Sequence, residues 1–277
     1  MSDRSLTMLV HGMSGSGKST LAASAPKPLL YLDVEMASRF LRGRKKKWNP
    51  LTEAPPEADG SWDICVVTLD EFQKAQKAYE YLKSGRHPFK SVVVDSISEL
   101  QSKAVENIKG RQQLQTQDWG KLLSVMSFFC RDLRDLAGTD ESIEAVVITA
   151  MSRDYDGIIK PYLQGQIASQ VPYWFDITAY LYVQQVADQI TGEVRDTRNL
   201  LVGNHPNYEA KSRVPGLPTV IENPDITVML NNIFGVDEAA ITQTAPVAAP
   251  VQELPAQGPS FAEVAAGPVG QPEPPSL

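Results

Sequence analysis

Gly12-Met13-Ser14-Gly15-Ser16-Gly17-Lys18-Ser19 lies between a short apolar segment, residues 6–10, and a helix-forming segment, residues 20–23. It matches the pattern G-x-x-x-x-G-K-[ST] at every required position. Glycines let the backbone wrap closely around a polyphosphate, and the inward N–H groups and the dipole at a helix start favour negative charge. The stretch, which we call the P-loop, therefore predicts a cradle for a nucleoside triphosphate between a strand and a helix.

Two side chains of the P-loop have specific expected roles. Lys18 is expected to reach the terminal phosphates, and the Ser19 hydroxyl is expected to ligate Mg²⁺. The residues expected to bind the nucleotide are Gly12, Met13, Ser14, Gly15, Ser16, Gly17, Lys18, Ser19 and Thr20.

Composition indicates a soluble, globular protein. A chain of 277 residues that is 42% hydrophobic can bury a substantial core. No apolar run reaches the ~20 residues that a membrane span needs, and the polar start of the chain is unlike a signal peptide. We therefore expect a cytoplasmic location and no membrane partner. Cys65 and Cys130 lie in apolar stretches and are expected to be buried free thiols.

Charge is distributed unevenly along the chain. From residue 237 onward there is no Lys or Arg, and the acids are Asp237, Glu238, Glu253, Glu263 and Glu273. These acids account for −5 of the net charge of −7, which leaves −2 for the preceding residues. A nearly neutral body argues against strong long-range attraction of a polyanion, but it allows local basic patches.

Two regions are predicted from the change in composition near the C-terminus. From about Ile241 the sequence is rich in Ala, Pro, Gln and Val without periodicity, which is typical of a disordered segment. We therefore predict a domain over residues 1–236 and a disordered, acidic tail over residues 237–277. Within the tail, residues 260–265 fit either a short docking helix or an ordinary linker segment.

The domain has the pattern of an α/β fold, in which apolar strands alternate with helices around a mainly parallel sheet. Strands are predicted at residues 6–10, 29–32, 64–68, 91–94 and 145–149, and helices at residues 70–82, 97–108 and 122–136. After Thr149 the segments shorten and turn signals become frequent, which predicts an antiparallel extension at one sheet edge. Residues 42–60 have the character of an exposed insertion.

A carboxylate follows the predicted strand at residues 91–94. Asp95 ends an apolar run of three valines and precedes Ser96 and a helical segment. P-loop proteins supply their second magnesium-associated group in this form. Ser19 and Asp95 are therefore the expected metal ligands.

The combination of these features resembles the RecA-like ATPase core, which recombinases, DnaB-type helicases and the KaiC group share. In that family a Glu just past the strand after the P-loop helix orients or deprotonates the attacking water. The resemblance implies this role for Glu35, with Asp33 as the alternative.

Two further parts of the chain resemble the RecA-like pattern. Lys211 and Arg213 look like the Lys-x-Arg strand of such assemblies, and residues two apart in a strand point to one face. The resemblance implies that they stabilise the γ-phosphate held by a neighbouring subunit, so that hydrolysis requires an oligomer, a ring or a filament. Thr149 stands where the family has a polar sensor, but residues 149–151 lack the glutamine of recombinases.

The overall arrangement is most similar to small RecA-like, AAA-domain ATPases encoded by bacteriophages, some of which are linked to single-strand annealing and recombination. In the resembling fold, the loops after the strands at residues 91–94 and 145–149 contact single-stranded DNA. Basic residues with interleaved aromatics suit backbone neutralisation and base stacking. The candidate DNA contacts are Lys109, Arg111, Arg153 and Lys160, with Tyr155 and Tyr162 beside them. Tyr162 also fits a plain structural role in a hydrophobic hairpin.

The leading hypothesis is a cytoplasmic, Mg²⁺-dependent ATPase that oligomerises and acts on single-stranded DNA in annealing, recombination or replication support. The preference for ATP and a location in the host cytoplasm are implied by the resemblance. One alternative is a small-molecule kinase with a nucleoside-type acceptor. Another is a nucleotide-gated interaction module that recruits a single-strand-binding or replication protein through the tail.

Overall fold

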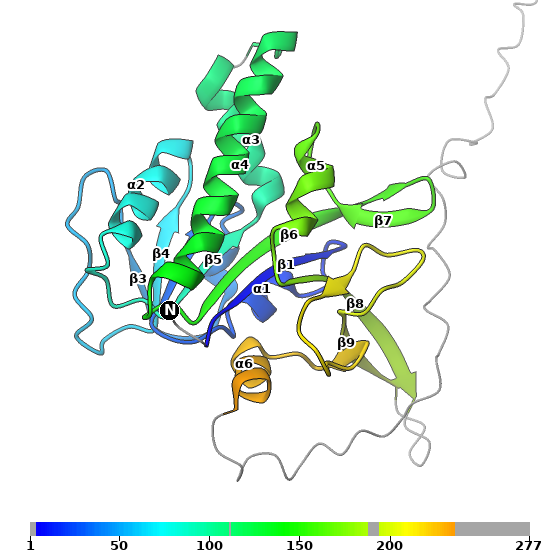
Figure 1. Cartoon of the computed structure of the whole chain (residues 1–277). Helices are drawn as coiled ribbons and strands as arrows, with labels where there is room; N and C mark the ends of the chain where they lie inside the picture. The colour runs from blue at the N-terminus through cyan, green and yellow to red at the C-terminus, as the bar shows by residue number, and fades with distance from the viewer. Residues whose placement is uncertain (1–3, 111, 188–193, 236–277) are drawn as a thin grey trace, which may run out of the picture. The chain divides into compact units, whose positions relative to one another are not determined.

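The computed structural model describes residues 4–110, 112–187 and 194–235 (Figure 1). The predicted tail over residues 237–277 and the candidate DNA contact Arg111 lie outside the described residues. The predicted boundary between domain and tail therefore stays a prediction.

A mixed sheet forms the centre of the domain, and its order is β11-β9-β8-β1-β6-β5-β2-β4-β3. The strands from β8 to β3 in this order are all parallel, as expected for strands joined by crossover helices. They are β8 (Ile177–Ala187), β1 (Leu6–Gly12), β6 (Ala145–Tyr155), β5 (Ser91–Asp95), β2 (Leu29–Asp33), β4 (Ile64–Thr68) and β3 (Lys45–Lys47). The mainly parallel α/β fold predicted from the sequence is confirmed.

Antiparallel strands extend the sheet beyond β8, also as predicted. β9 (Val194–Leu201) pairs with β8, and β11 (Val220–Glu222) pairs with β9. The two-residue strand β10 (Lys211–Ser212) lies against β8, and β7 (Ile158–Pro161) folds back on the end of β6 as a hairpin. β6 is longer than predicted, because the chain stays extended through Tyr155 to form this hairpin.

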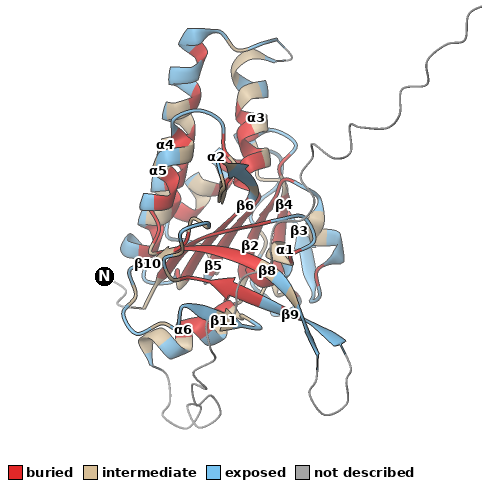
Figure 2. Ribbon diagram, turned by 90° about the vertical axis from the view of Figure 1, so that its right-hand side faces the viewer, coloured by how far each residue is buried: buried red, intermediate tan, exposed pale blue. Residues whose placement is uncertain are grey.

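Helices cover both faces of the sheet, whose strands are largely buried (Figure 2). One face packs against α2 (Phe72–Lys83), α3 (Ile97–Lys109) and α4 (Thr116–Thr139), and the other against α1 (Lys18–Ala22) and α6 (Ile226–Phe234). The remaining elements are the short helix α5 (Ile167–Gln170) and two 3-10 helices, η1 (Ala37–Phe40) and η2 (Val171–Tyr173). α3 and α4 form a hairpin that projects from the body (Figure 1). Because helices cover both faces of the sheet, its central strands β1, β2, β4 and β5 are buried and consist of largely apolar residues.

The prediction that residues 42–60 form an exposed insertion is wrong at Trp48, which is only 5% exposed. Its indole N–H donates to the Glu53 carbonyl at 3.2 Å, and its ring lies 5.3 Å from that of Tyr81. The three lysines of β3 are exposed, because they form the edge strand of the sheet. The insertion therefore wraps back onto the core through one indole. Both cysteines are buried free thiols, as predicted.

Candidate nucleotide-binding site

The P-loop connects the carboxyl end of β1 to α1 at the edge where the parallel strands end. Gly12 is required here because a Cβ atom on it would lie 2.5 Å from the Leu181 carbonyl oxygen and 2.7 Å from Ser16 Oγ. Gly17 has φ +97°, in the left-handed region that favours glycine. The backbone therefore takes the tightly wound form that the sequence pattern predicts. Because α1 has only five residues, the loop amides contribute more to an anion site than the helix dipole does.

Two polar groups of the P-loop are available to a ligand. The Lys18 ammonium donates to the carbonyls of Gly12 at 2.9 Å and Met13 at 3.0 Å, so it folds back over the loop. Burial lowers the pKa of Lys18, and the carboxylates of Glu35 and Asp95 act against that decrease. Ser16 is 5% exposed, and its hydroxyl has no hydrogen-bond partner among the described residues. A buried hydroxyl without a partner is rare, and a bound polyphosphate supplies acceptors of the kind it lacks.

Asp95 lies at the centre of a buried hydrogen-bond network at the end of β5. Its two carboxylate oxygens accept hydrogen bonds from the Tyr31 and Thr149 hydroxyls. Burial and then the Asp95 charge raise the pKa of Tyr31, and the approach of the Ser19 side chain partly offsets the rise. Tyr31 thus stands between Ser19 and Asp95, the two expected metal ligands. No sequence pattern marks this tyrosine, because it stands among the core residues of an apolar strand.

The structure distinguishes the two candidates for the catalytic carboxylate. Asp33 is 1% exposed, and its two oxygens accept the backbone N–H groups of Ala37 at 3.0 Å and Ser38 at 3.1 Å. It therefore holds the start of η1. Glu35 is exposed, and its carboxylate accepts a hydrogen bond from the Ser96 hydroxyl at the end of β5. This geometry favours Glu35 over Asp33 as the group that faces a bound nucleotide.

The donor set fits Mg²⁺. A serine hydroxyl and one or two carboxylates are hard oxygen ligands, and Mg²⁺ completes its coordination with phosphate oxygens and water. Within the described residues no cluster of three or more His, Cys, Asp or Glu side chains forms a self-contained metal cage. Ser19 and Asp95 would hold the ion.

The comparison with protein families agrees with this geometry. A family model described as "AAA domain" matches residues 4–214, well over half of the chain. The chain belongs to the AAA domain family. No curated protein matches it. The matched region of the AAA domain contains the P-loop, both carboxylates and the Lys-x-Arg pair, and it identifies a nucleotide-binding domain of the P-loop ATPase type.

Lys211 of the AAA domain lies in β10, and Arg213 lies just past the end of that two-residue strand, but both side chains reach the same segment. Lys211 donates to the Phe175 carbonyl at 3.1 Å, and Arg213 donates to the Tyr173 carbonyl at 2.6 Å. Arg213 also lies 3.8 Å from the Asp176 carboxylate. Within the part of the chain that the structure describes, neither cation bonds to the P-loop. The pair is therefore brought together on residues 173–176, apart from the nucleotide cradle of its own chain.

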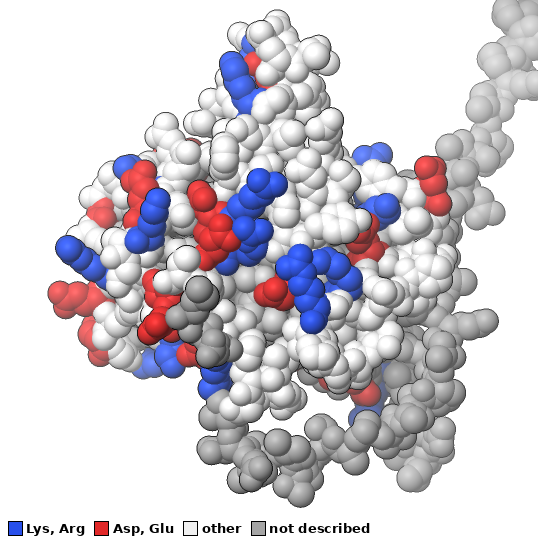
Figure 3. Space-filling model, in the orientation of Figure 1, with Lys and Arg blue, Asp and Glu red and all other residues white. Residues whose placement is uncertain are grey.

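The candidate DNA contacts fall into two places. Arg153 and Lys160 are directly paired across the β6–β7 hairpin, with the Arg153 guanidinium 5.3 Å from the centre of the Tyr162 ring. Lys109 instead lies at the end of α3, where its ammonium is 3.3 Å from the Asp118 carboxylate that caps α4. The α3–α4 hairpin and the β6–β7 hairpin project in different directions (Figure 1), so these cations do not form one surface. Lys and Arg side chains are mixed with Asp and Glu on the face in Figure 3.

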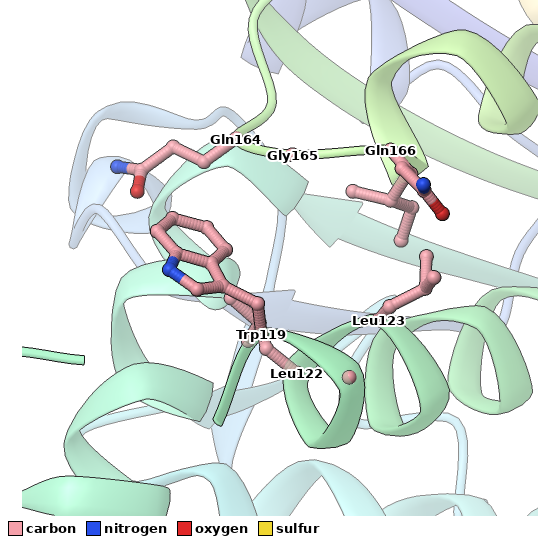
Figure 4. Close-up of a pocket in the computed structure, with 8 residues that line it drawn as sticks. Trp119, Leu122, Leu123, Gln164, Gly165 and Gln166 are labelled. Carbon is pink, nitrogen blue, oxygen red and sulfur yellow. The ribbon is translucent and has the colours of Figure 1, made fainter. Parts of the chain in front are cut away.

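A cavity of about 310 Å³ lies away from the P-loop, between the start of α4 and the loop before α5. Figure 4 shows Trp119 and Leu123 of α4 facing residues 164–166, and Gly165 packs against the indole. No P-loop residue lines this cavity.

Within the described residues, no helix is both long enough and apolar enough to cross a membrane.

Proposed function

We propose that this AAA domain binds ATP with Mg²⁺ and hydrolyses it. The observation that carries the proposal is the placement of Glu35 and Asp95 around Lys18, at the edge of the sheet where the P-loop lies. The choice of ATP among nucleoside triphosphates follows from the resemblance to RecA-like ATPases. One carboxylate for the metal ion and a second one for the attacking water are what hydrolysis needs beyond nucleotide binding, so this combination supports a hydrolase.

Each group has a distinct task in this proposal. Lys18 leaves the carbonyls of the loop and neutralises charge on the terminal phosphates. Ser19 and Asp95 would hold Mg²⁺, which would neutralise charge at the phosphate oxygens. Glu35, held by the Ser96 hydroxyl and open to solvent, accepts a proton from the attacking water.

Tyr31 and Thr149 position Asp95. Because both carboxylate oxygens already accept hydrogen bonds, the Asp95 side chain has a fixed orientation before any ligand arrives. Orientation of a ligand group by a surrounding shell of hydrogen bonds is a general feature of metal sites. Because Thr149 belongs to β6, a movement of Asp95 on ligand binding would be transmitted through this hydrogen bond to β6 and the β6–β7 hairpin.

We further propose that hydrolysis occurs between subunits. Lys211 and Arg213 lie together on residues 173–176, and they would leave the Phe175 and Tyr173 carbonyls and the Asp176 carboxylate to meet a γ-phosphate bound by a neighbouring chain. A cation supplied in this way stabilises the charge of the transition state and typically raises the rate by about 10³–10⁵-fold. The domain alone would then turn over slowly.

Single-stranded DNA is the proposed partner of the assembly. The paired Arg153 and Lys160 give the β6–β7 hairpin two cations at one register position, next to the Tyr162 ring. Such a combination suits phosphate neutralisation with base stacking. Two of the candidate cations already have acidic partners: Lys109 lies 3.3 Å from the Asp118 carboxylate, and Lys160 lies 3.7 Å from the Glu209 carboxylate. Each would have to leave its partner to meet a DNA phosphate.

Phosphate release from ATP tests the first proposal. Wild type should release phosphate only with Mg²⁺, Lys18→Ala should lose nucleotide binding, and Glu35→Gln should bind ATP but turn over at least 100-fold more slowly. Single-stranded DNA should accelerate release, and Arg153→Ala with Lys160→Ala should remove the acceleration. Absence of turnover under all conditions would contradict the hydrolase, and unchanged turnover with DNA would remove the DNA proposal alone.

A mixing experiment tests catalysis between subunits. Lys18→Ala chains keep the Lys-x-Arg pair, and Arg213→Ala chains keep an intact P-loop, so each variant alone should be inactive. A mixture should recover activity if the cations act on the neighbouring site. If the mixture stays as inactive as the separate variants, or if Arg213→Ala alone is fully active, the proposal of action between subunits is wrong.

A further inference from the structure

Arg198 of β9 lies directly against the P-loop. A Cβ atom on Gly17 would be 2.6 Å from Arg198 Nε and 3.6 Å from Cζ, so the guanidinium packs on the backbone of the residue before Lys18. Gly17 leaves the space that this side chain uses. The strand alternation explains the direction: Leu200, two residues on, packs into the core on the α1 side of the sheet, and Arg198 points to the same side nearer the P-loop.

The backbone fixes Arg198 in this place. It pairs with Val183 of β8, and its carbonyl accepts the N–H of Asn223 at 2.7 Å. Its neighbours Thr197 and Asn199 are buried, at 3% and 6% exposure. Only the long side chain extends to the surface, beside the loop. Because the strand already orders the backbone here, binding of a ligand would have to order only the rotamers of the Arg198 side chain.

Arg198 has no anionic partner within residues 4–110, 112–187 and 194–235. Two other exposed arginines do have such a partner: Arg44 lies 2.7 Å from the Asp63 carboxylate, and Arg213 lies 3.8 Å from that of Asp176. What distinguishes Arg198 from the remaining exposed arginines is its place against the P-loop backbone. The P-loop thus has two hydrogen-bond donors without an acidic partner among the described residues: the Arg198 guanidinium packed against it and the Ser16 hydroxyl within it. Arginine presents a planar fork of N–H donors that matches phosphate oxygens.

We propose that Arg198 is a phosphate-binding residue of the nucleotide site, acting on the nucleotide held by its own chain. This proposal rests on the proposed function and adds a second cation to it. P-loop backbones cradle the α- and β-phosphates, and Arg198 lies on that backbone rather than at the Lys18 ammonium. The contact is therefore made with the diphosphate that ADP and ATP share, which separates its role from that of Lys211 and Arg213.

Nucleotide affinity of matched arginine variants tests the proposal. A fluorescent ADP analogue is titrated into wild type, Arg198→Ala, Arg198→Lys and Arg195→Ala. Arg195 is an exposed arginine on the same strand, an odd number of residues away and so on its other face. Arg198→Ala should weaken ADP and ATP equally, by about 10–100-fold, as expected for a charge-assisted hydrogen bond. Arg198→Lys should fall between, and Arg195→Ala should match wild type.

Displacement of the analogue by inorganic pyrophosphate identifies the part of the nucleotide that is contacted. Pyrophosphate should also bind about 10–100-fold more weakly to Arg198→Ala. If ADP weakens while pyrophosphate does not, the arginine contacts the sugar or base and the proposal is overturned. Equal affinity of Arg198→Ala and Arg195→Ala for ADP overturns it as well. These failures differ from that of the proposed function, in which wild type itself does not bind, or Lys18→Ala binds as wild type does.

Discussion

His11, the residue before the P-loop, makes the stability of this protein depend on pH. Its ring is fully buried, Nε2 donates to the Glu209 carbonyl at 2.8 Å, and Nδ1 accepts from the Ser152 hydroxyl at 2.9 Å. Burial lowers the pKa of His11 from 6.5 to about 4, and the Lys18 charge adds to the decrease. The folded protein therefore holds the neutral ring, whereas the unfolded chain binds a proton below pH 6.5.

The sign and size of the effect follow from these two pKa values. Stability is complete above pH 6.5 and is lost as the pH falls towards 4, because protonation then favours the unfolded chain. At about 1.4 kcal/mol per pH unit, the full difference is about 3 kcal/mol. Between pH 7 and pH 5 the free energy of unfolding should fall by about 2 kcal/mol, because the unfolded chain binds a proton at His11 and the folded protein does not.

Urea unfolding followed by circular dichroism at pH 7 and pH 5 measures this difference. His11→Gln keeps a side-chain N–H donor but cannot titrate, and every other acidic and basic group is common to the two proteins. Wild type should lose about 2 kcal/mol more than the variant between these pH values. Equal losses would refute the assignment of a neutral, buried His11.

Four further substitutions separate structural from functional groups. Tyr31→Phe removes the hydroxyl that orients Asp95, so nucleotide binding should need a higher Mg²⁺ concentration in a metal titration. The same substitution should lower stability by about 1–3 kcal/mol, measured by thermal melting. Asp33→Ala should lower the melting temperature, because it removes the cap of η1, whereas Glu35→Gln should leave melting unchanged and slow turnover. Trp48→Ala should cost about 3–5 kcal/mol in urea unfolding, since it empties a buried site. A melting temperature equal to wild type would contradict the role given to Trp48.

The elements that the sequence predicted well are those whose signals are local. Five apolar runs became the central parallel strands, because strands buried on both faces need continuous hydrophobicity. The helix α6 was missed although it has local signals: Asp225 accepts the N–H of Val228 as an N-cap, and Gly235 follows the helix. Capping residues of this kind are local signals from which a helix can be predicted.

The sequence favoured Glu35 over Asp33 only through the resemblance to RecA-like ATPases, because the different environments of the two carboxylates depend on a turn. After β2 the chain reverses through Met36 at φ 56°, a conformation that is uncommon for methionine and that no sequence pattern announces. This turn directs the Asp33 carboxylate to the N–H groups of η1 and leaves Glu35 beside Ser96. Arg198 and Tyr31 were missed for a related reason, since their roles arise from strand neighbours far away in the sequence.

The charges around the P-loop explain why a metal ion should be required for binding as well as for hydrolysis. Glu35 and Asp95 lie close enough to Lys18 to oppose the decrease of its pKa, so they offset its positive charge before a nucleotide arrives. A triphosphate would then enter a site in which Lys18 already interacts with two carboxylates. Negative charges that lie a few ångströms apart and are partly buried repel each other by several kcal/mol. Mg²⁺ bound with the nucleotide would relieve this repulsion. Chelation of the metal should therefore weaken ATP more than ADP in a filter-binding or calorimetric titration, and Asp95→Asn should reduce that difference. Equal weakening of both nucleotides would show that the carboxylates do not face the terminal phosphate.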